Sequence, residues 1–135
     1  GIQSHIEMRM IDRATGIGPY DLKEWRAFCD DVTGMGYRLL LTEFDVKDNG
    51  LPADHAARDA GVANYTRAYL QVMLSYPQLR DILAWGMVDK FSWLQGFAPR
   101  ADGLPQRCCP YGDDYRPHPM RAALADLFAG AAPRA

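Results

Sequence analysis

Short apolar runs alternate with amphipathic segments along this chain. Apolar residues recur at spacings of three and four in the segments we expect to be helices, and they form short continuous runs in the segments we expect to be strands. Asp21 and Glu24 have the spacing of a capping box at the start of the first helix, which Gly34 and Gly36 can end. The expected order is strand 1–6, helix 22–32, strand 37–46, helix 56–75, strand 81–88, a long loop 91–115 and helix 119–128.

This order of strands and helices predicts an α/β fold. Strands that are separated by helices are usually parallel and are joined by right-handed crossovers. The length of 135 residues suits a single domain, and the sequence contains no internal repeat. Three parallel strands with three helices would leave sheet edges and apolar faces uncovered. We therefore expect the chain to need a further segment or another copy to close its sheet.

Two carboxylates stand at the end of the second apolar run, in the sequence LLLTEFDV. Side chains alternate between the two faces of a strand, so Leu39, Leu41, Glu43 and Asp45 are expected on one face and Phe44 on the other. Burial of a carboxylate is costly unless the group is paired or used, and sites in parallel α/β proteins form at the carboxyl ends of strands. Glu43 is therefore a candidate site residue, although a structural hydrogen bond to a neighbouring loop would explain it equally well.

The other two strands also end in polar or aromatic residues. The same alternation places Gln3 with His5, and it places Trp85 with the leucine two residues before it. Taken singly, His5 fits a hydrogen-bonded core histidine, and Trp85 and Trp93 fit core packing as well as a ligand site.

The overall composition narrows the classes of function. The net charge is −2 and charges of both signs are mixed along the chain, so we expect no nucleic-acid partner. No apolar run approaches the roughly 20 residues that span a bilayer, and the sequence carries no recognisable leader. Cys29, Cys108 and Cys109 lack the spacing of a zinc motif or a disulfide framework. We expect free thiols and no metal or cofactor, while a disulfide from Cys108 or Cys109 to another segment stays open.

Three motifs taken together resemble those of a known family. GIQSHI, LLLTEFDV and ILAWGMVDKFSWL resemble the last three barrel strands of family 10 glycoside hydrolases, the retaining endo-β-1,4-xylanases, whose patterns read Q-x-H, T-E-x-D and W-G-x-x-D-x-x-S-W. YRPHPM resembles the segment before the last helix of that family. The motifs occur in the family's order along the whole chain. The resemblance implies that residues 1–135 form the carboxyl-terminal part of one TIM (β/α)8 barrel, as three parallel βα units that contain strands 6 to 8.

The resemblance also implies a catalytic group of three residues. Glu43 would be the nucleophile, and His5 with Asp45 would orient it and keep it ionised. The implied function is the retaining hydrolysis of internal β-1,4 bonds in xylan, by an enzyme that is secreted or periplasmic.

Three further residues would contact the substrate. Gln3 would contact the sugar and the nucleophile near the cleaved bond. Trp85 and Trp93 would form aromatic walls around the sugar on the non-reducing side of that bond. Lys90 lies where the family usually has a polar residue, and we assign it no role.

One required group is missing from the sequence. The family's acid/base glutamate ends strand four in a motif of the type W-D-V-V-N-E, whereas the other glutamates here, Glu7 and Glu24, fall in an expected loop and helix. We therefore expect the chain alone to be inactive until the amino-terminal half of the barrel completes it. Asp48 or Asp89 of another copy is a less favoured source of the acid. The alternatives are a non-catalytic carbohydrate-binding or assembly fragment and a structural remnant without a ligand.

Overall fold

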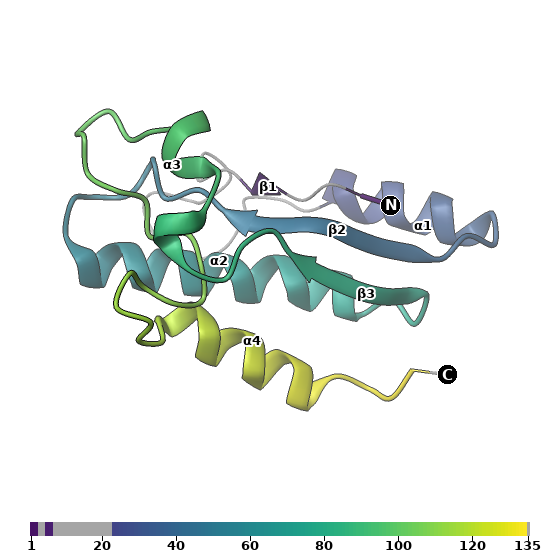
Figure 1. The fold of residues 1–135 in the computed structure, drawn as a ribbon. Coiled ribbons are helices and arrows are strands. Elements are labelled where there is room, and N and C mark those ends of the chain that lie inside the picture. Colours follow the sequence, from purple (N-terminus) through teal and green to yellow (C-terminus); the bar gives the residue numbers. More distant parts are fainter. Residues whose placement is uncertain (3–4, 7–22, 135) are drawn as a thin grey trace.

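The computed structural model describes residues 1–2, 5–6 and 23–134, with residues 5 and 6 described by their backbone alone. Strands and helices alternate as the sequence predicts (Figure 1). Asp21, Gln3 and the side chains of His5 and Glu24 lie outside the described part, so the expected capping box stays a prediction. The elements are β1 His5–Ile6, α1 Lys23–Gly34, β2 Leu39–Val46, α2 His55–Leu74, β3 Leu79–Ala84, the 3-10 helix η2 Asp89–Phe91, α3 Leu94–Phe97 and α4 Pro119–Gly130.

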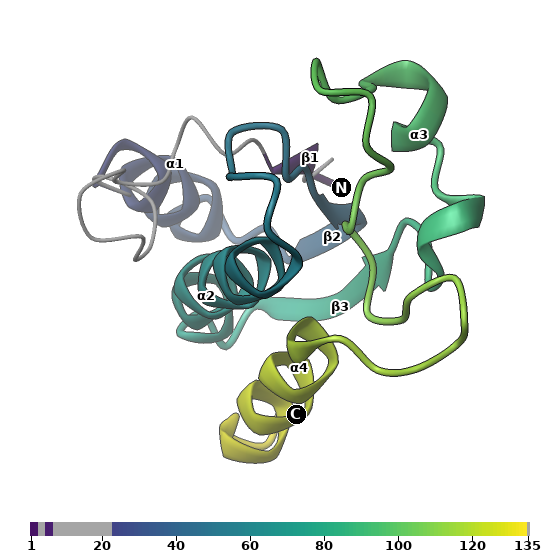
Figure 2. The same cartoon turned by 90° about the vertical axis from the view of Figure 1, so that its left-hand side faces the viewer.

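The three strands form one parallel sheet in the order β1-β2-β3. Figure 1 shows the carboxyl ends of β2 and β3 pointing toward the end of the molecule that carries α3. Helices α1, α2 and α4 lie on the opposite side of the sheet from α3 (Figure 2). The predicted parallel α/β architecture is therefore confirmed for the described residues. Because the strands are parallel, their carboxyl ends lie at the same edge of the sheet.

The core lies between the sheet and the three long helices. Phe44 on β2 stacks on Tyr69 of α2 with ring centroids 6.1 Å apart and planes 14° apart. Each large apolar side chain that is fully buried stabilises the fold by about 1.5–3 kcal/mol. This packing fixes the end of β2 against the helical layer. Other buried members of the core are Cys29, Leu39, Leu41, Val46, Val62, Tyr65, Leu70, Val72, Met73, Leu79 and Met120.

The alternation expected along β2 is interrupted. The register between β2 and β3 shifts between Leu41 and Phe44, and both of these residues belong to the helix-facing core. An extra residue in one strand reverses which face the following side chains occupy. Our prediction that Leu41 shares a face with Glu43 is therefore wrong. Glu43 and Asp45 still lie opposite Phe44, because the alternation resumes after the shift.

The last strand is also displaced from its expected position. It was predicted at 81–88, whereas β3 spans Leu79–Ala84. The chain leaves the sheet at Gly86, whose φ of +137° is unfavourable for residues with a side chain. Beyond this point the backbone pairs with Tyr111, whose N–H donates to Met87 O at 3.1 Å. The segment after β3 thus folds back on the strand end; it contains η2, which begins before the expected loop, and α3, which lies within that loop.

Local signals fix the starts of α2 and α4. Asp54 caps α2, and its side chain accepts a hydrogen bond from the Ala57 N–H at 2.8 Å. Pro119 opens α4, where its missing N–H costs no helical hydrogen bond. Among the described residues, no helix has both the length and the apolar character needed to cross a membrane.

Candidate active site

Glu43 and Asp45 occupy the carboxyl end of β2, the central strand. Glu43 is half-buried, whereas Asp45 is only 2% exposed. The strand end is held on its β3 side, because the N–H of Trp85 donates to the carbonyl of Phe44 at 2.9 Å. The two carboxylates therefore stand on a supported strand end, as sites in parallel α/β proteins do.

Trp93 contacts Asp45 directly. The indole Nε1 of Trp93 donates a hydrogen bond to Asp45 Oδ2 at 2.7 Å. A buried carboxylate needs such a donor to offset the loss of water. The bond joins the segment after η2 to β2, so Trp93 has a structural role beside the aromatic wall that its motif implied.

An aromatic surface extends from Trp93. Phe97 lies one helical turn further along α3 and its ring centroid is 4.3 Å from that of Trp93, with 33° between the planes. Phe97 is 70% exposed and Trp85 is 47% exposed. These rings offer exposed apolar faces. Sequence reasoning missed Phe97, although its spacing of four residues from Trp93 on a short helix is a usable signal.

The backbone brings β1 to the same place. His5 is the register partner of Asp45 on β2, so the Q-x-H and T-E-x-D motifs meet at neighbouring strand ends. The orientation of the His5 imidazole and the position of Gln3 lie outside the described residues. The side chain of Lys90 makes a cation–π contact with Tyr115, with Nζ 4.3 Å from the ring centroid.

A buried ion cluster supports the segment that follows β2. Asp48 is fully buried and contacts two guanidinium groups, that of Arg58 at 2.5 Å and that of Arg100 at 3.3 Å. The N–H of Arg107 also donates to Asp48 Oδ2 at 3.0 Å. Several donors to one carboxylate offset the cost of its burial. The cluster ties the loop after β2 to α2 and to the loop before α4.

Asp89 anchors the base of the segment that carries Trp93. Its Oδ1 accepts hydrogen bonds from the N–H groups of Cys108 and Cys109, both at 2.9 Å. Burial raises the pKa of Asp89 to about 7, against the lowering effect of these two bonds. Asp89 and Asp48 are both buried and bonded within the chain. Neither carboxylate is therefore available to serve the site of another copy.

Comparison with known proteins identifies the family. Residues 1–127 match the family model described as Glycosyl hydrolase family 10. The chain belongs to this family. It is 26% identical over 133 residues to Endo-1,4-beta-xylanase B of Thermotoga neapolitana. The matched region covers 95% of this chain but only 33% of that protein.

Solved structures with the same fold include family 10 xylanases. Xylanase 10B from Thermotoga maritima superposes with a TM-score of 0.76 at 22% identity. The superposed region covers 96% of this chain and 36% of that xylanase. Xylanase 10B from Thermotoga petrophila, solved in complex with xylobiose, gives the same TM-score, identity and coverage. These neighbours are TIM barrels, so the parallel βα units seen here correspond to part of such a barrel. The chain spans about a third of the length of these relatives.

Proposed function

We propose that this chain supplies the nucleophile half of a retaining glycoside hydrolase that cleaves internal β-1,4 bonds of xylan. One observation carries the proposal: in a chain that matches family 10 over residues 1–127, Glu43 and Asp45 end a parallel strand beside two tryptophans. In this proposal residues 1–135 belong to one barrel domain as strands 6 to 8 with their helices. The xylanase names of the relatives support the substrate class.

The chemistry requires an ionised carboxylate at the position of Glu43. In retaining hydrolysis this carboxylate attacks the anomeric carbon and forms a glycosyl-enzyme, while an acid about 5 Å away protonates the leaving oxygen. That second carboxyl then removes a proton from water, and the resulting hydroxide releases the sugar from Glu43. The amino-terminal part of the barrel supplies this acid/base group in our proposal, so the isolated chain does not turn over xylan.

The neighbours of Glu43 have distinct roles in this scheme. His5, held by Asp45, orients the nucleophile and favours its charged form by a hydrogen bond in this scheme, and the Trp93 indole keeps Asp45 in place by the 2.7 Å hydrogen bond. Gln3 contacts the sugar near the cleaved bond. Trp85 and Trp93 present apolar ring faces to the C–H faces of the sugar, which binds a neutral polymer without an ion pair.

The exposed rings of Trp85 and Phe97 also support a second candidate function, carbohydrate binding without catalysis. Under this alternative Glu43 would make no covalent bond with a sugar. Export from the cytoplasm remains part of the main proposal, and cell fractionation with an antibody against the chain tests it.

The test uses a completed barrel, made by joining the chain to the amino-terminal part of a family 10 xylanase. Glu43→Ala should reduce hydrolysis of xylo-oligosaccharides by several orders of magnitude, because it removes the atom that forms the covalent intermediate. Azide should restore part of the cleavage of an activated aryl xyloside and give a glycosyl azide of inverted anomeric configuration. Asp81→Ala, an exposed carboxylate on β3, is the matched control. Activity of Glu43→Ala within about tenfold of the parent contradicts the assignment.

A further inference from the structure

Two adjacent cysteines and a distant aspartate form a buried cluster at the base of the loop before α4. One ligand atom from each of Asp89, Cys108 and Cys109 lies within 4.8 Å of the other two, and all three residues are buried. No part of the proposed hydrolysis uses these thiols. Asp89 precedes Cys108 by 19 residues and Cys109 by 20, which is why no metal motif is visible in the sequence.

The spacing of the two sulfurs suits one tetrahedral metal ion. Cys108 Sγ and Cys109 Sγ lie 3.8 Å apart. Two thiolates bound to one tetrahedral zinc ion at about 2.3 Å each are about 3.8 Å from one another. Two uncharged thiols in van der Waals contact lie at a similar distance. The surroundings of the Asp89 carboxylate therefore have to distinguish a metal site from a simple contact between thiols.

That carboxylate is short of positive charge. Within the described part of the chain, the one basic group within 4 Å of Asp89 is the imidazole of His118, with Nδ1 3.5 Å from Oδ2. No Lys or Arg of the described residues lies within 4 Å of Asp89. A buried carboxylate beside two thiols has the donor types that bind zinc.

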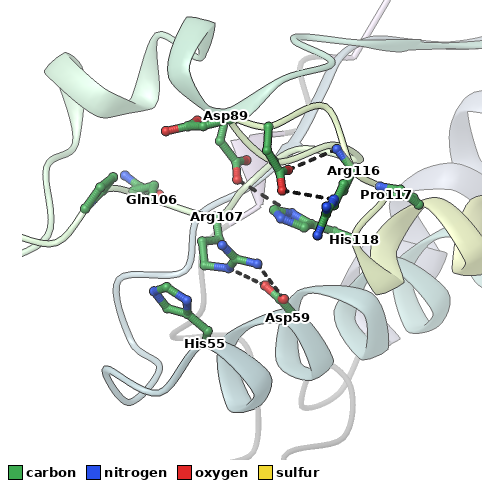
Figure 3. Close-up of a pocket in the computed structure, with 12 residues that line it drawn as sticks. His55, Asp59, Asp89, Gln106, Arg107, Arg116, Pro117 and His118 are labelled. Atoms are coloured by element: carbon green, nitrogen blue, oxygen red, sulfur yellow. Dashed lines mark hydrogen bonds and ion pairs between the residues drawn. The ribbon is translucent and has the colours of Figure 1, made fainter.

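A pocket provides access to this cluster. Figure 3 shows Asp89 and His118 facing one another beside the Arg107–Asp59 ion pair. The pocket has a volume of about 450 Å³ and reaches both Asp89 and His118. Its lining carries four aspartates, Asp59, Asp89, Asp113 and Asp114, against two arginines, Arg107 and Arg116. The negative balance favours entry of a cation.

We propose that Asp89, Cys108 and Cys109 bind one zinc-like divalent cation, with the fourth position left to a water molecule from the pocket. Such an ion would join the start of η2 to the loop before α4, and so brace the segment that carries Trp93. On binding, each thiol loses its proton to solvent and both sulfurs bond to the metal, with no change of oxidation state. The ion would be structural, because its three protein ligands are all buried and no step of the proposed hydrolysis takes place at them.

The test needs no hydrolytic activity, so its outcome is independent of the proposed xylan hydrolysis. The chain is kept reduced with a phosphine, equilibrated with Zn²⁺, desalted and analysed for bound metal. One zinc ion per chain is expected. Addition of Co²⁺ in place of zinc should give the sulfur-to-cobalt charge-transfer absorption of thiolate ligands. Absence of stoichiometric zinc, or a cobalt complex without this absorption, overturns the proposal.

Cysteine variants locate the ligands. Cys108→Ser and Cys109→Ser should each weaken zinc binding by more than about tenfold, and Asp89→Asn should weaken it as well. Cys29→Ser is the matched control, because Cys29 is also a buried free cysteine but lies on α1 in the main core. Unchanged binding by Cys108→Ser/Cys109→Ser overturns the site. If these variants misfold, the cobalt spectrum of the unmodified chain decides, since it reports thiolate ligation directly. The proposal is also overturned if the chain is isolated with a disulfide between Cys108 and Cys109 and binds no zinc once this disulfide is reduced.

Discussion

Trp93 and Asp45 are 48 residues apart in the sequence and are joined by a hydrogen bond of 2.7 Å between Nε1 and Oδ2. The bond links the aromatic segment after β3 to the strand that carries Glu43. A shift of either segment would therefore alter the position of the other. Mutation of Trp93 tests this coupling.

Removal of that hydrogen bond should impair catalysis. Trp93→Phe keeps an aromatic ring but removes the donor to a buried carboxylate, a bond that contributes about 1.5–3 kcal/mol. We expect kcat/KM of the completed barrel on xylo-oligosaccharides to fall about 10- to 100-fold. Trp25→Phe is the control, since it removes an indole donor to Met73 Sδ in the helical layer. Equal losses in the two variants would show that the Trp93–Asp45 bond has no special role.

The ion cluster around Asp48 should contribute strongly to stability. Arg58→Ala leaves a fully buried carboxylate with one cationic partner fewer, and we expect the free energy of unfolding to fall by about 3–5 kcal/mol. Arg67→Ala is the matched comparison, because Arg67 pairs with Asp126 at 3.9 Å on an exposed surface. This variant should lose at most about 1 kcal/mol. Urea denaturation followed by tryptophan fluorescence measures both, and similar losses would contradict the argument.

Asp102 should make the stability of the fold sensitive to acid. A hydrogen bond from Arg100 lowers the pKa of Asp102 to about 2, below the value of about 3.9 in an unfolded chain. The stabilisation is therefore present above about pH 4 and is lost as the pH falls toward 2. Asp102→Asn should flatten the decline of the melting temperature over this range. Thermal melts at intervals of half a pH unit test this, and parallel curves for the parent and Asp102→Asn would refute it.

The 135-residue chain alone should associate with itself or bind an apolar dye. Leu83, Trp85 and Met87 are each about half exposed, and β3 is an edge of the described sheet. Joining the missing part of the barrel should abolish both effects. Light scattering and dye fluorescence measure them. A monodisperse monomer of the chain alone that binds no dye would show that these surfaces are already covered.

Much of the fold is encoded in local sequence patterns. The helices and the parallel order follow from apolar spacing and from the alternation of strands and helices, as in the apolar run that begins at Leu39. The two incorrect predictions have causes outside the local sequence. The register shift before Phe44 depends on pairing with β3, and the early end of β3 depends on the backbone conformation of Gly86 and on its partner Tyr111. Strand pairing across 40 or so residues is not visible in a strand's own sequence.

The site was predictable only in part. The T-E-x-D and W-G-x-x-D-x-x-S-W motifs predict Glu43, Trp85 and Trp93 as site residues. Parallel pairing places their strands side by side. The bond between Trp93 and Asp45 was not foreseen, because it depends on the fold of η2 and α3. The contact of Asp89 with Cys108 and Cys109 is not visible in the sequence for the same reason, since the two cysteines lie 19 and 20 residues from Asp89.

Trapping of the covalent intermediate tests the central claim most directly. A 2-fluoro xylobioside with a good leaving group should inactivate the completed barrel, and mass spectrometry of its peptides should locate one added sugar on Glu43. Excess xylobiose should slow the labelling. A sugar attached to a different carboxylate, or binding of the compound with no label at all, would contradict the assignment of Glu43 as the nucleophile.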